Sequence, residues 1–158
     1  PVEINLDNLL KEEIDLFDSR DNIKFSYMGL DNASVMGPKP QLTRVFVNLI
    51  NNAVQAIENA QAETEEKGLE PFQGRIVVSL RLSSKDGFYD IVFEDNGPGV
   101  SEENRSKLFT PNFTTKSNGT GLGLSICRNI LEKCNGEIFY SKSFTLKGAC
   151  FTVRFPRK

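Results

Sequence analysis

The chain has 158 residues, 39% of them hydrophobic, and its 19 basic and 21 acidic residues leave a formal net charge of -2. This length fits a single domain, 1–158, with its own hydrophobic core, and the balance of charge excludes a general affinity for nucleic acid or an anionic membrane. No apolar run approaches the roughly 20 residues that span a bilayer, so we expect no direct membrane contact from this chain.

The chain contains three cysteines and no histidine. Cys127, Cys134 and Cys150 form no CxxC pair, and their odd number argues against a closed disulfide framework. We therefore expect a reducing, cytoplasmic environment. Cys127 and Cys134 fall in a predicted helix, where we expect them to act as small apolar residues.

Hydrophobic spacing predicts three elements near the start of the chain. Apolar residues at helical intervals predict a helix over 5–17, and Asn5 or Asp7 is available as its N-cap. Alternating apolar and polar residues predict a strand over 23–27. A shorter strand is predicted over 34–37, before two prolines.

The middle of the chain contains the clearest helix and a hairpin. An apolar stripe predicts a helix from 41 to about 60, and the loss of this periodicity predicts a loop over 61–74. Period-two alternation on both sides of Asp86-Gly87 predicts two antiparallel strands, over 75–82 and 88–94.

The last third begins with a long segment, 96–119, that is rich in turn-forming residues. We expect it to be a functional loop with a short helical turn near 102–108. A helix is predicted over 120–134, ended by Asn135-Gly136. A second hairpin, with strands over 137–144 and 149–155, follows it.

Four amide side chains fall on one face of the long helix. They are Asn48, Asn52, Gln55 and Asn59. One interpretation is a solvated face, although surface helices usually favour Lys and Glu over Asn. The alternative is a metal site, because amides one turn apart can direct carbonyl oxygens at Mg²⁺ and leave room for its waters.

Asp95 follows an apolar strand and precedes Asn96-Gly97-Pro98-Gly99. All of these residues are common in turns, which is the simplest interpretation. A carboxylate at a strand end can also select an exocyclic amine. Gly97 and Gly99 allow positive φ or the close approach of a flat ring to the backbone.

A glycine-rich block over 119–124, GTGLGL, opens the predicted helix 120–134. It is either a flexible loop or a phosphate site, because a helix N-terminus presents free N–H groups to an anion. Lys116 offers a cation for distal phosphates, and Thr114, Thr115 and Thr120 offer hydroxyl donors. Other phosphate motifs do not fit: GxxxxGK[ST] is missing, and Leu124 stands where GxGxxG needs glycine.

Taken in order, these blocks resemble the ATP-binding catalytic domain of bacterial sensor histidine kinases, in the superfamily that includes gyrase and MutL. The similarity spans nearly the whole chain. The matching segments are 48–53 (NLINNA), 95–100 (DNGPGV), 108–116 (LFTPNFTTK), 119–124 (GTGLGL) and 148–153 (GACFTV). The resemblance implies an α/β fold, a two-layer sandwich of the Bergerat type, with a mixed sheet of about five strands covered by helices on one face.

The resemblance also implies roles for individual residues. Asn52 binds the Mg²⁺ that bridges the phosphates, Asp95 binds the adenine amine, and Gly97 and Gly99 shape the adenine pocket. The implied phosphate-binding residues are Thr115, Lys116, Gly119, Thr120, Gly121, Leu122 and Gly123.

Asn48 stands where gyrase-like members carry a glutamate that activates water. An amide cannot act as a general base, so transfer to a supplied histidine is favoured over vigorous hydrolysis. The implied catalytic residues are Asn48, Asn52 and Lys116.

By this resemblance, the chain is the catalytic domain of a two-component sensor histidine kinase. It would transfer the γ-phosphate of Mg-ATP to a histidine on a separate dimerisation domain, for relay to a response regulator. The chain has no histidine, so the acceptor must lie elsewhere. The alternatives are a serine kinase of the anti-sigma-factor type and a nucleotide-gated binding module without catalysis.

The sequence departs from the family pattern at two positions. Asn112 stands where the family often has Phe, and Pro38 stands where an Asp commonly precedes the long helix; we expect Pro38 to alter only the helix entry. Phe109 and Phe113 are either a hinge or docking surface, or packing aromatics. A short lid and Gln55 are most similar to nitrogen-regulation-type kinases.

Overall fold

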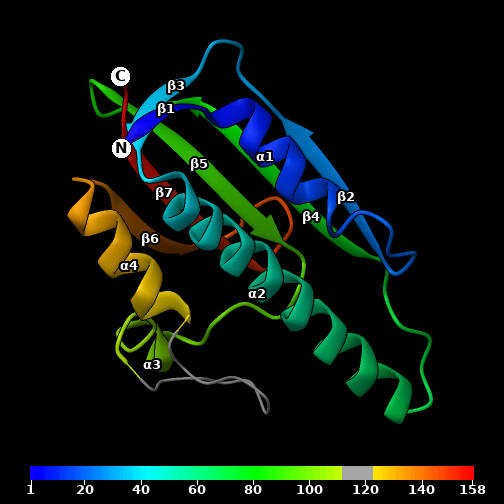
Figure 1. Ribbon diagram of the computed structural model, residues 1–158. Helices are drawn as coiled ribbons and strands as arrows, with labels where there is room; N and C mark the ends of the chain where they lie inside the picture. Colours follow the sequence, from blue (N-terminus) through cyan, green and yellow to red (C-terminus); the bar gives the residue numbers. More distant parts are fainter. Residues whose placement is uncertain (112–122) are drawn as a thin grey trace.

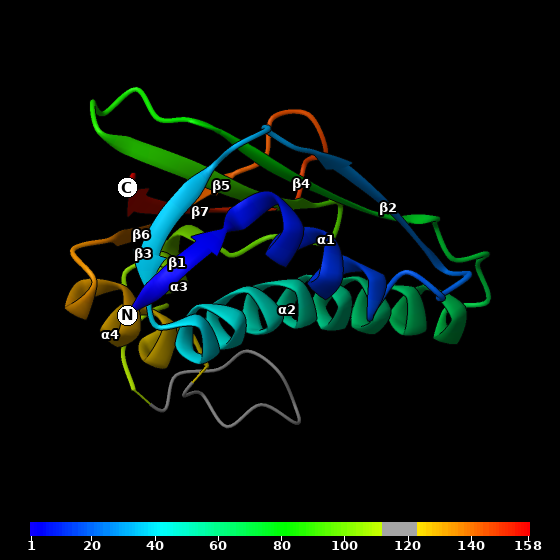
Figure 2. The same cartoon turned by 45° about the horizontal axis from the view of Figure 1, so that its top comes forward.

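The computed structural model describes residues 1–111 and 123–158, which form two layers (Figure 1). One layer is a five-stranded sheet and the other consists of helices packed on one of its faces, which is clearest in Figure 2. The predicted α/β sandwich is confirmed.

The sheet is mixed, in the order β2-β4-β5-β7-β6. Only β2 and β4 pair in parallel; the other neighbours are antiparallel. The strands are β2 (Ile23–Met28), β4 (Gly74–Leu82), β5 (Phe88–Asp95), β6 (Glu137–Lys142) and β7 (Ala149–Pro156). Both predicted hairpins are therefore present, β4 with β5 and β6 with β7.

The chain also forms a small second sheet, of which the sequence predicts one strand only. β1 (Val2–Asn5) pairs antiparallel with β3 (Ser34–Gly37). β3 was expected, but β1 was missed, because only Ile4 of its four residues is buried and its partner is distant in the sequence. Helix α1 (Leu6–Asp15) follows directly, and Asn5 caps it by accepting a hydrogen bond from the Asn8 N–H.

Helix α2 (Lys39–Glu66) is the longest element and lies along the sheet. Its N-cap is Pro38, which makes no side-chain hydrogen bond to the helix; that this departure alters only the helix entry stays a prediction. The predicted loop over 61–74 is wrong in its first part, because α2 continues to Glu66. Gln61 explains the extension: it is buried, and its amide donates to the carbonyls of Asn22 and Phe72.

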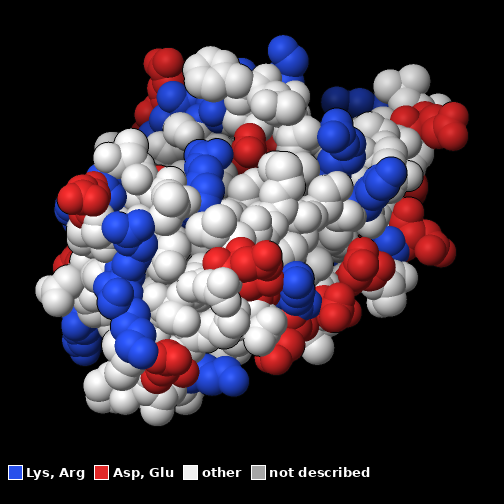
Figure 3. Space-filling view, turned by 90° about the horizontal axis from the view of Figure 1, so that it is seen from above, with Lys and Arg blue, Asp and Glu red and all other residues white. Residues whose placement is uncertain are grey.

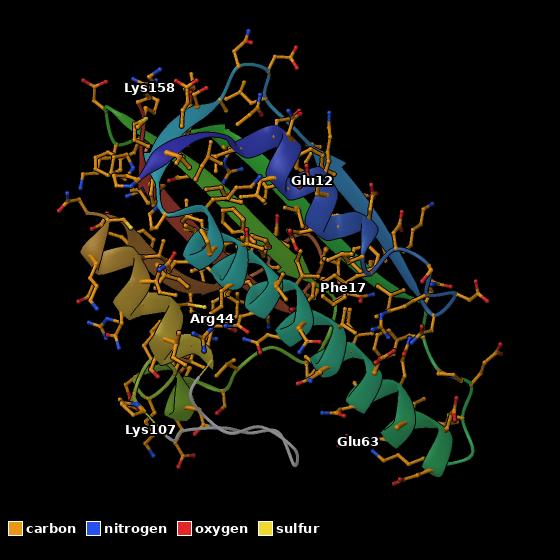
Figure 4. All side chains as sticks on the ribbon, in the orientation of Figure 1. Glu12, Phe17, Arg44, Glu63, Lys107 and Lys158 are labelled. Atoms are coloured by element: carbon orange, nitrogen blue, oxygen red, sulfur yellow. The ribbon has the colours of Figure 1, made fainter. Side chains whose placement is uncertain are left out.

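The core lies between the sheet and the helices. β7 shows why: its residues alternate between buried and half-buried, with Phe151, Val153 and Phe155 facing the helices. From the other side, α2 contributes Phe46, whose ring lies 6.0 Å from that of Phe93 on β5. Phe17, just after α1, also packs against this core and is labelled in Figure 4.

The two other helices of the described chain are α3 (Glu102–Arg105) and α4 (Gly123–Lys133). α4 packs against α2 and β6, and the short α3 follows β5. Asn135 ends the α4 region with φ 61°, as the Asn135-Gly136 pair predicts.

Charge is mixed on the surface. On the face that Figure 3 shows, acidic and basic side chains are both scattered, and neither sign covers a broad area. Within residues 1–111 and 123–158, no helix is both long and apolar enough to cross a membrane.

Candidate nucleotide-binding site

Asp95 is the last residue of β5, and its side chain is only 3% exposed. Its Oδ1 accepts hydrogen bonds from the backbone N–H groups of Gly97, at 2.9 Å, and Ala149, at 3.3 Å. No hydrogen bond to Oδ2 is present among the described residues. Burial raises the pKa of Asp95 to about 6, against the lowering effect of the two N–H donors. Near neutral pH the site therefore holds an oriented carboxylate whose Oδ2 accepts from no donor among the described residues.

Three glycines surround this carboxylate. A Cβ on Gly148 would lie 2.5 Å from Asp95 Oδ1 and 2.7 Å from the carbonyl oxygen of Gly97, so only glycine fits there. Gly99 adopts φ +75°, in the left-handed region that favours glycine. Gly97 is buried. The turn after β5 thus approaches the chain at Gly148, just before β7, more closely than a side chain at that position would allow.

The turn is fixed to the sheet on its other side by Asn96. Its Oδ1 accepts from the Arg75 N–H at 2.7 Å, and its Nδ2 donates to the Gln73 carbonyl at 2.9 Å. These bonds join the turn to the start of β4. The motif around Asp95 is therefore a turn held to the sheet by side-chain hydrogen bonds, and this structure is compatible with its interpretation as a binding site.

The middle of helix α2, around Ala56, lies beside the turn after Asp95. A Cβ on Gly97 would lie 3.4 Å from Ala56 Cβ, so this part of α2 lines the turn after Asp95. Asn52 precedes Ala56 by one turn and is half-buried, so it lies on the same side of the helix. Asn52 is thus close to the Asp95 turn although 43 positions separate the two residues in the sequence.

Asn48, one turn earlier, points toward α4. Its Nδ2 donates to Cys127 Sγ at 3.7 Å, and that thiol lies 3.9 Å from the Val45 carbonyl oxygen. Burial raises the pKa of Cys127 to about 11, so the thiol stays protonated. The expectation that Cys127 is a core residue is confirmed. Arg44 lies in the same region between α2 and α4 (Figure 4).

The predicted phosphate-binding segment is only partly described. Thr115, Lys116, Gly119, Thr120, Gly121 and Leu122 lie outside the described residues, as do Asn112, Phe113 and Thr114. Gly123 is the first residue of α4, and a Cβ there would meet no atom of the described residues within 4 Å.

The described residues offer few ligands for a metal ion at this site. In the described part of the chain, no group of three or more His, Cys, Asp and Glu side chains could hold an ion. From the amide stripe, Asn52 is a half-buried candidate donor one helical turn from Ala56, which lies beside the turn. A single amide suits Mg²⁺, which keeps several waters and is usually bound through phosphates.

Sequence reasoning missed several residues that build the site. Gly148 and Ala149 were assigned only to a closing strand, yet they contact Asp95 directly. Tyr140 on β6 was not singled out, although its hydroxyl accepts from the Val100 N–H at 3.0 Å. Phe109 is half-buried and packs edge-on against Phe151, with centroids 6.4 Å apart, so packing is its observed role.

A mixed sheet with helices on one face, a buried carboxylate at a strand end and an adjacent amide helix define an ATP-binding domain of the histidine kinase and gyrase class. Residues 37–158 match the family described as "Histidine kinase-, DNA gyrase B-, and HSP90-like ATPase". The chain belongs to this family.

Two curated relatives and one solved structure indicate the histidine kinase branch of this family. The chain is 39% identical over 116 residues to the sensor histidine kinase ZraS of Salmonella typhi. The matched segment covers 73% of this chain and 22% of ZraS. It is 30% identical over 160 residues to sporulation kinase A of Bacillus subtilis, and this match covers 98% of this chain and 24% of the kinase. The catalytic domain of histidine kinase ThkA superposes with a TM-score of 0.81 at 29% identity, covering 99% of this chain and 95% of that domain.

The chain is thus the ATP-binding catalytic domain of the histidine kinase type. It spans less than a third of the length of the curated relatives it matches, 22% and 24% in the two cases above. Those relatives therefore contain large parts that have no counterpart in this chain.

Proposed function

We propose that residues 1–158 are a single domain that binds Mg-ATP and donates its γ-phosphoryl group to a histidine on a separate dimerisation domain. The observation that carries this proposal is Asp95. One carboxylate oxygen is held by two backbone N–H groups, and the other is left to accept a hydrogen bond from the adenine amine. Guanine would present a carbonyl oxygen in place of this amine and would be repelled.

The amide helix supplies the proposed metal ligand. Asn52 would bind Mg²⁺ through its carbonyl oxygen, beside the turn that receives the base. Asn48 cannot remove a proton from water, and its Nδ2 is already engaged by Cys127. This favours retention of the phosphoryl group for an acceptor over hydrolysis.

The other phosphate contacts follow from the sequence motif. Lys116 and Thr115 would bind the distal phosphates, together with Thr120, Leu122 and the N–H groups of Gly119, Gly121 and Gly123. ATP would supply the reactive phosphoryl group, and the protein would hold it in line with the incoming imidazole nitrogen.

The acceptor and the next partner lie outside this chain, which has no histidine. We propose a cytoplasmic parent kinase whose dimerisation domain presents the histidine, and a response regulator that then receives the phosphoryl group. ThkA, to which this chain is 27% identical in that structure, has been solved in complex with the response regulator protein TrrA. That precedent supports the assignment. The nitrogen-regulation type stays a prediction.

A phosphotransfer experiment tests the proposal. The domain is mixed with γ-labelled ATP and Mg²⁺, alone and with a histidine-bearing dimerisation domain from the same kinase. We expect acid-labile label on the added domain only. Acid-stable label on another protein would favour a serine kinase, and ATP binding without any transfer would favour a nucleotide-gated module.

The metal ligand is tested with a matched pair of variants. Asn52→Ala should abolish Mg²⁺-dependent transfer and retain much of the affinity for adenosine, because the base is bound elsewhere. Asn59→Ala changes the same residue type on the same helix face at an exposed position and should leave transfer intact. Undiminished transfer by Asn52→Ala would refute the metal assignment.

A further inference from the structure

Val100 is the point where the turn after β5 is fixed from two sides. Its N–H donates to the Tyr140 hydroxyl on β6 at 3.0 Å, and its carbonyl oxygen accepts from Arg105 Nε on α3 at 3.2 Å. Both polar backbone groups of one residue are therefore held by side chains, from two different elements. Such bonds restrict both peptide units that flank the residue.

The two side chains that hold Val100 also hold each other. The Arg105 guanidinium carbon lies 5.4 Å from the centroid of the Tyr140 ring, within cation–π range. The same ring packs against Phe151 at 5.3 Å, with an interplanar angle of 64°. Because Phe151 belongs to the buried core, the hydroxyl of Tyr140 is presented from a rigid base.

This arrangement adjoins the buried carboxylate. A Cβ on Gly99 would lie 3.4 Å from the Tyr140 hydroxyl oxygen and 3.5 Å from the carbonyl carbon of Gly148. Gly148 in turn lies against Asp95. Tyr140 thus touches the same short turn that shapes the space in front of Asp95, without contacting Asp95 itself.

We propose that Tyr140 and Arg105 are positioning residues for nucleotide binding, which clamp Val100 and hold the turn of Gly97 and Gly99 in the conformation that receives the base. This inference rests on the proposed function, because it assumes that the base binds at Asp95. The clamp lowers the conformational entropy that binding would otherwise have to remove.

The clamp also joins the base site to α3. Arg105 is the last residue of α3, and the chain continues from there to the packed Phe109. A change in the turn that breaks the Val100 bonds would release Arg105. The order of α3 and the affinity for the base are therefore coupled through one residue.

The test uses Tyr140→Phe, which removes the hydroxyl and keeps the ring that packs on Phe151. ATP affinity is measured by calorimetry, and exchange of the Val100 amide is measured by NMR. We expect the Kd for ATP to rise by about three- to tenfold, the usual effect of one neutral hydrogen bond, and Val100 exchange to accelerate. ADP should lose the same factor as ATP, because the clamp acts on the base side.

Two further variants make the result specific. Tyr89→Phe makes the same change on β5, where Tyr89 is buried against Arg157, and should leave ATP affinity unchanged. Arg105→Lys keeps the charge but removes the guanidinium donor and should weaken ATP binding about two- to fivefold. The double variant Tyr140→Phe with Arg105→Lys should lose less than the product of the two single losses, because both changes release Val100.

The outcomes distinguish a failure of the positioning role of Tyr140 and Arg105 from a failure of the proposed ATP binding. If the unchanged protein binds ATP and Tyr140→Phe binds it equally well, the clamp has no positioning role. Equal weakening by Tyr89→Phe would also overturn it, because the loss would then reflect general destabilisation. If the unchanged protein does not bind ATP, the proposed function fails, and the inference that rests on it fails too.

Discussion

Replacing Asp95 with asparagine separates two effects of this carboxylate: the free energy of folding that its burial costs, and its contribution to ATP binding. Asparagine has nearly the same shape and keeps an oxygen that can accept from the Gly97 and Ala149 N–H groups. It removes the negative charge and places an NH₂ group where Asp95 presents its second oxygen. Asp95→Asn should therefore stabilise the ligand-free domain and weaken ATP binding.

The stability gain follows from the pKa of Asp95. The difference between about 6 in the folded protein and the ordinary value of 3.8 corresponds to about 3 kcal/mol, at 1.36 kcal/mol per pKa unit. Because the folded state holds the proton more tightly, the stability of the unchanged protein falls as the pH rises from about 4 to about 6. The advantage of Asp95→Asn should be complete above pH 6 and absent below pH 4.

The loss of binding follows from the lost acceptor. A hydrogen bond to a charged group contributes about 1.5–3 kcal/mol, so the Kd for ATP should rise roughly 10- to 150-fold at pH 7.5. For the unchanged protein, ATP affinity should fall as the pH drops below 6, because protonated Asp95 accepts less well.

The assays are urea unfolding between pH 4 and pH 8 and calorimetry with ATP. Asp90→Asn is the control: Asp90 is similarly buried but pairs with Arg154 at 2.9 Å, so this change should destabilise the domain and leave ATP affinity intact. Unchanged ATP affinity in Asp95→Asn would refute the adenine contact. If Asp95→Asn is less stable than the unchanged protein at pH 7.5, the claim that burying the Asp95 carboxylate destabilises the domain is refuted.

Three other substitutions test separate parts of the structure. Gly148→Ala should prevent tight ATP binding and cost roughly 3 kcal/mol of stability, because its Cβ would collide with Asp95; native ATP affinity would contradict this. Glu13→Gln should stabilise the domain by about 1 kcal/mol at pH 7.5, since Glu13 is buried, its Oε2 has no hydrogen-bond partner among the described residues, and burial raises its pKa. That gain should vanish in urea unfolding below the ordinary pKa of a glutamate, because the carboxyl is then protonated in both states; a gain that grows on acidification would be inconsistent with this. Gln61→Ala should cost roughly 2 kcal/mol, because the Phe72 carbonyl then has no donor among the described residues and the Asn22 carbonyl keeps only the Gly74 N–H; ATP affinity should not change, and equal melting temperatures would contradict the prediction.

Much of the fold could be predicted because its signals are local. The alternation on both sides of Asp86-Gly87 and the stop at Asn135-Gly136 depend on neighbouring residues alone, and the structure has both features. The errors have non-local causes. β1 forms because β3 pairs with it, and α2 continues past residue 60 because Gln61 bonds to carbonyls from other segments.

The sequence by itself determined the motifs, their order and the absence of histidine, because these are properties of the chain alone. Only the tertiary structure decided that Gly148 and Ala149 complete the Asp95 site, and that Tyr140 and Arg105 hold Val100. These contacts join residues from β5, β6, β7 and α3. Their spacing along the chain carries no signal, because distance in a folded sheet depends on strand order and not on sequence separation.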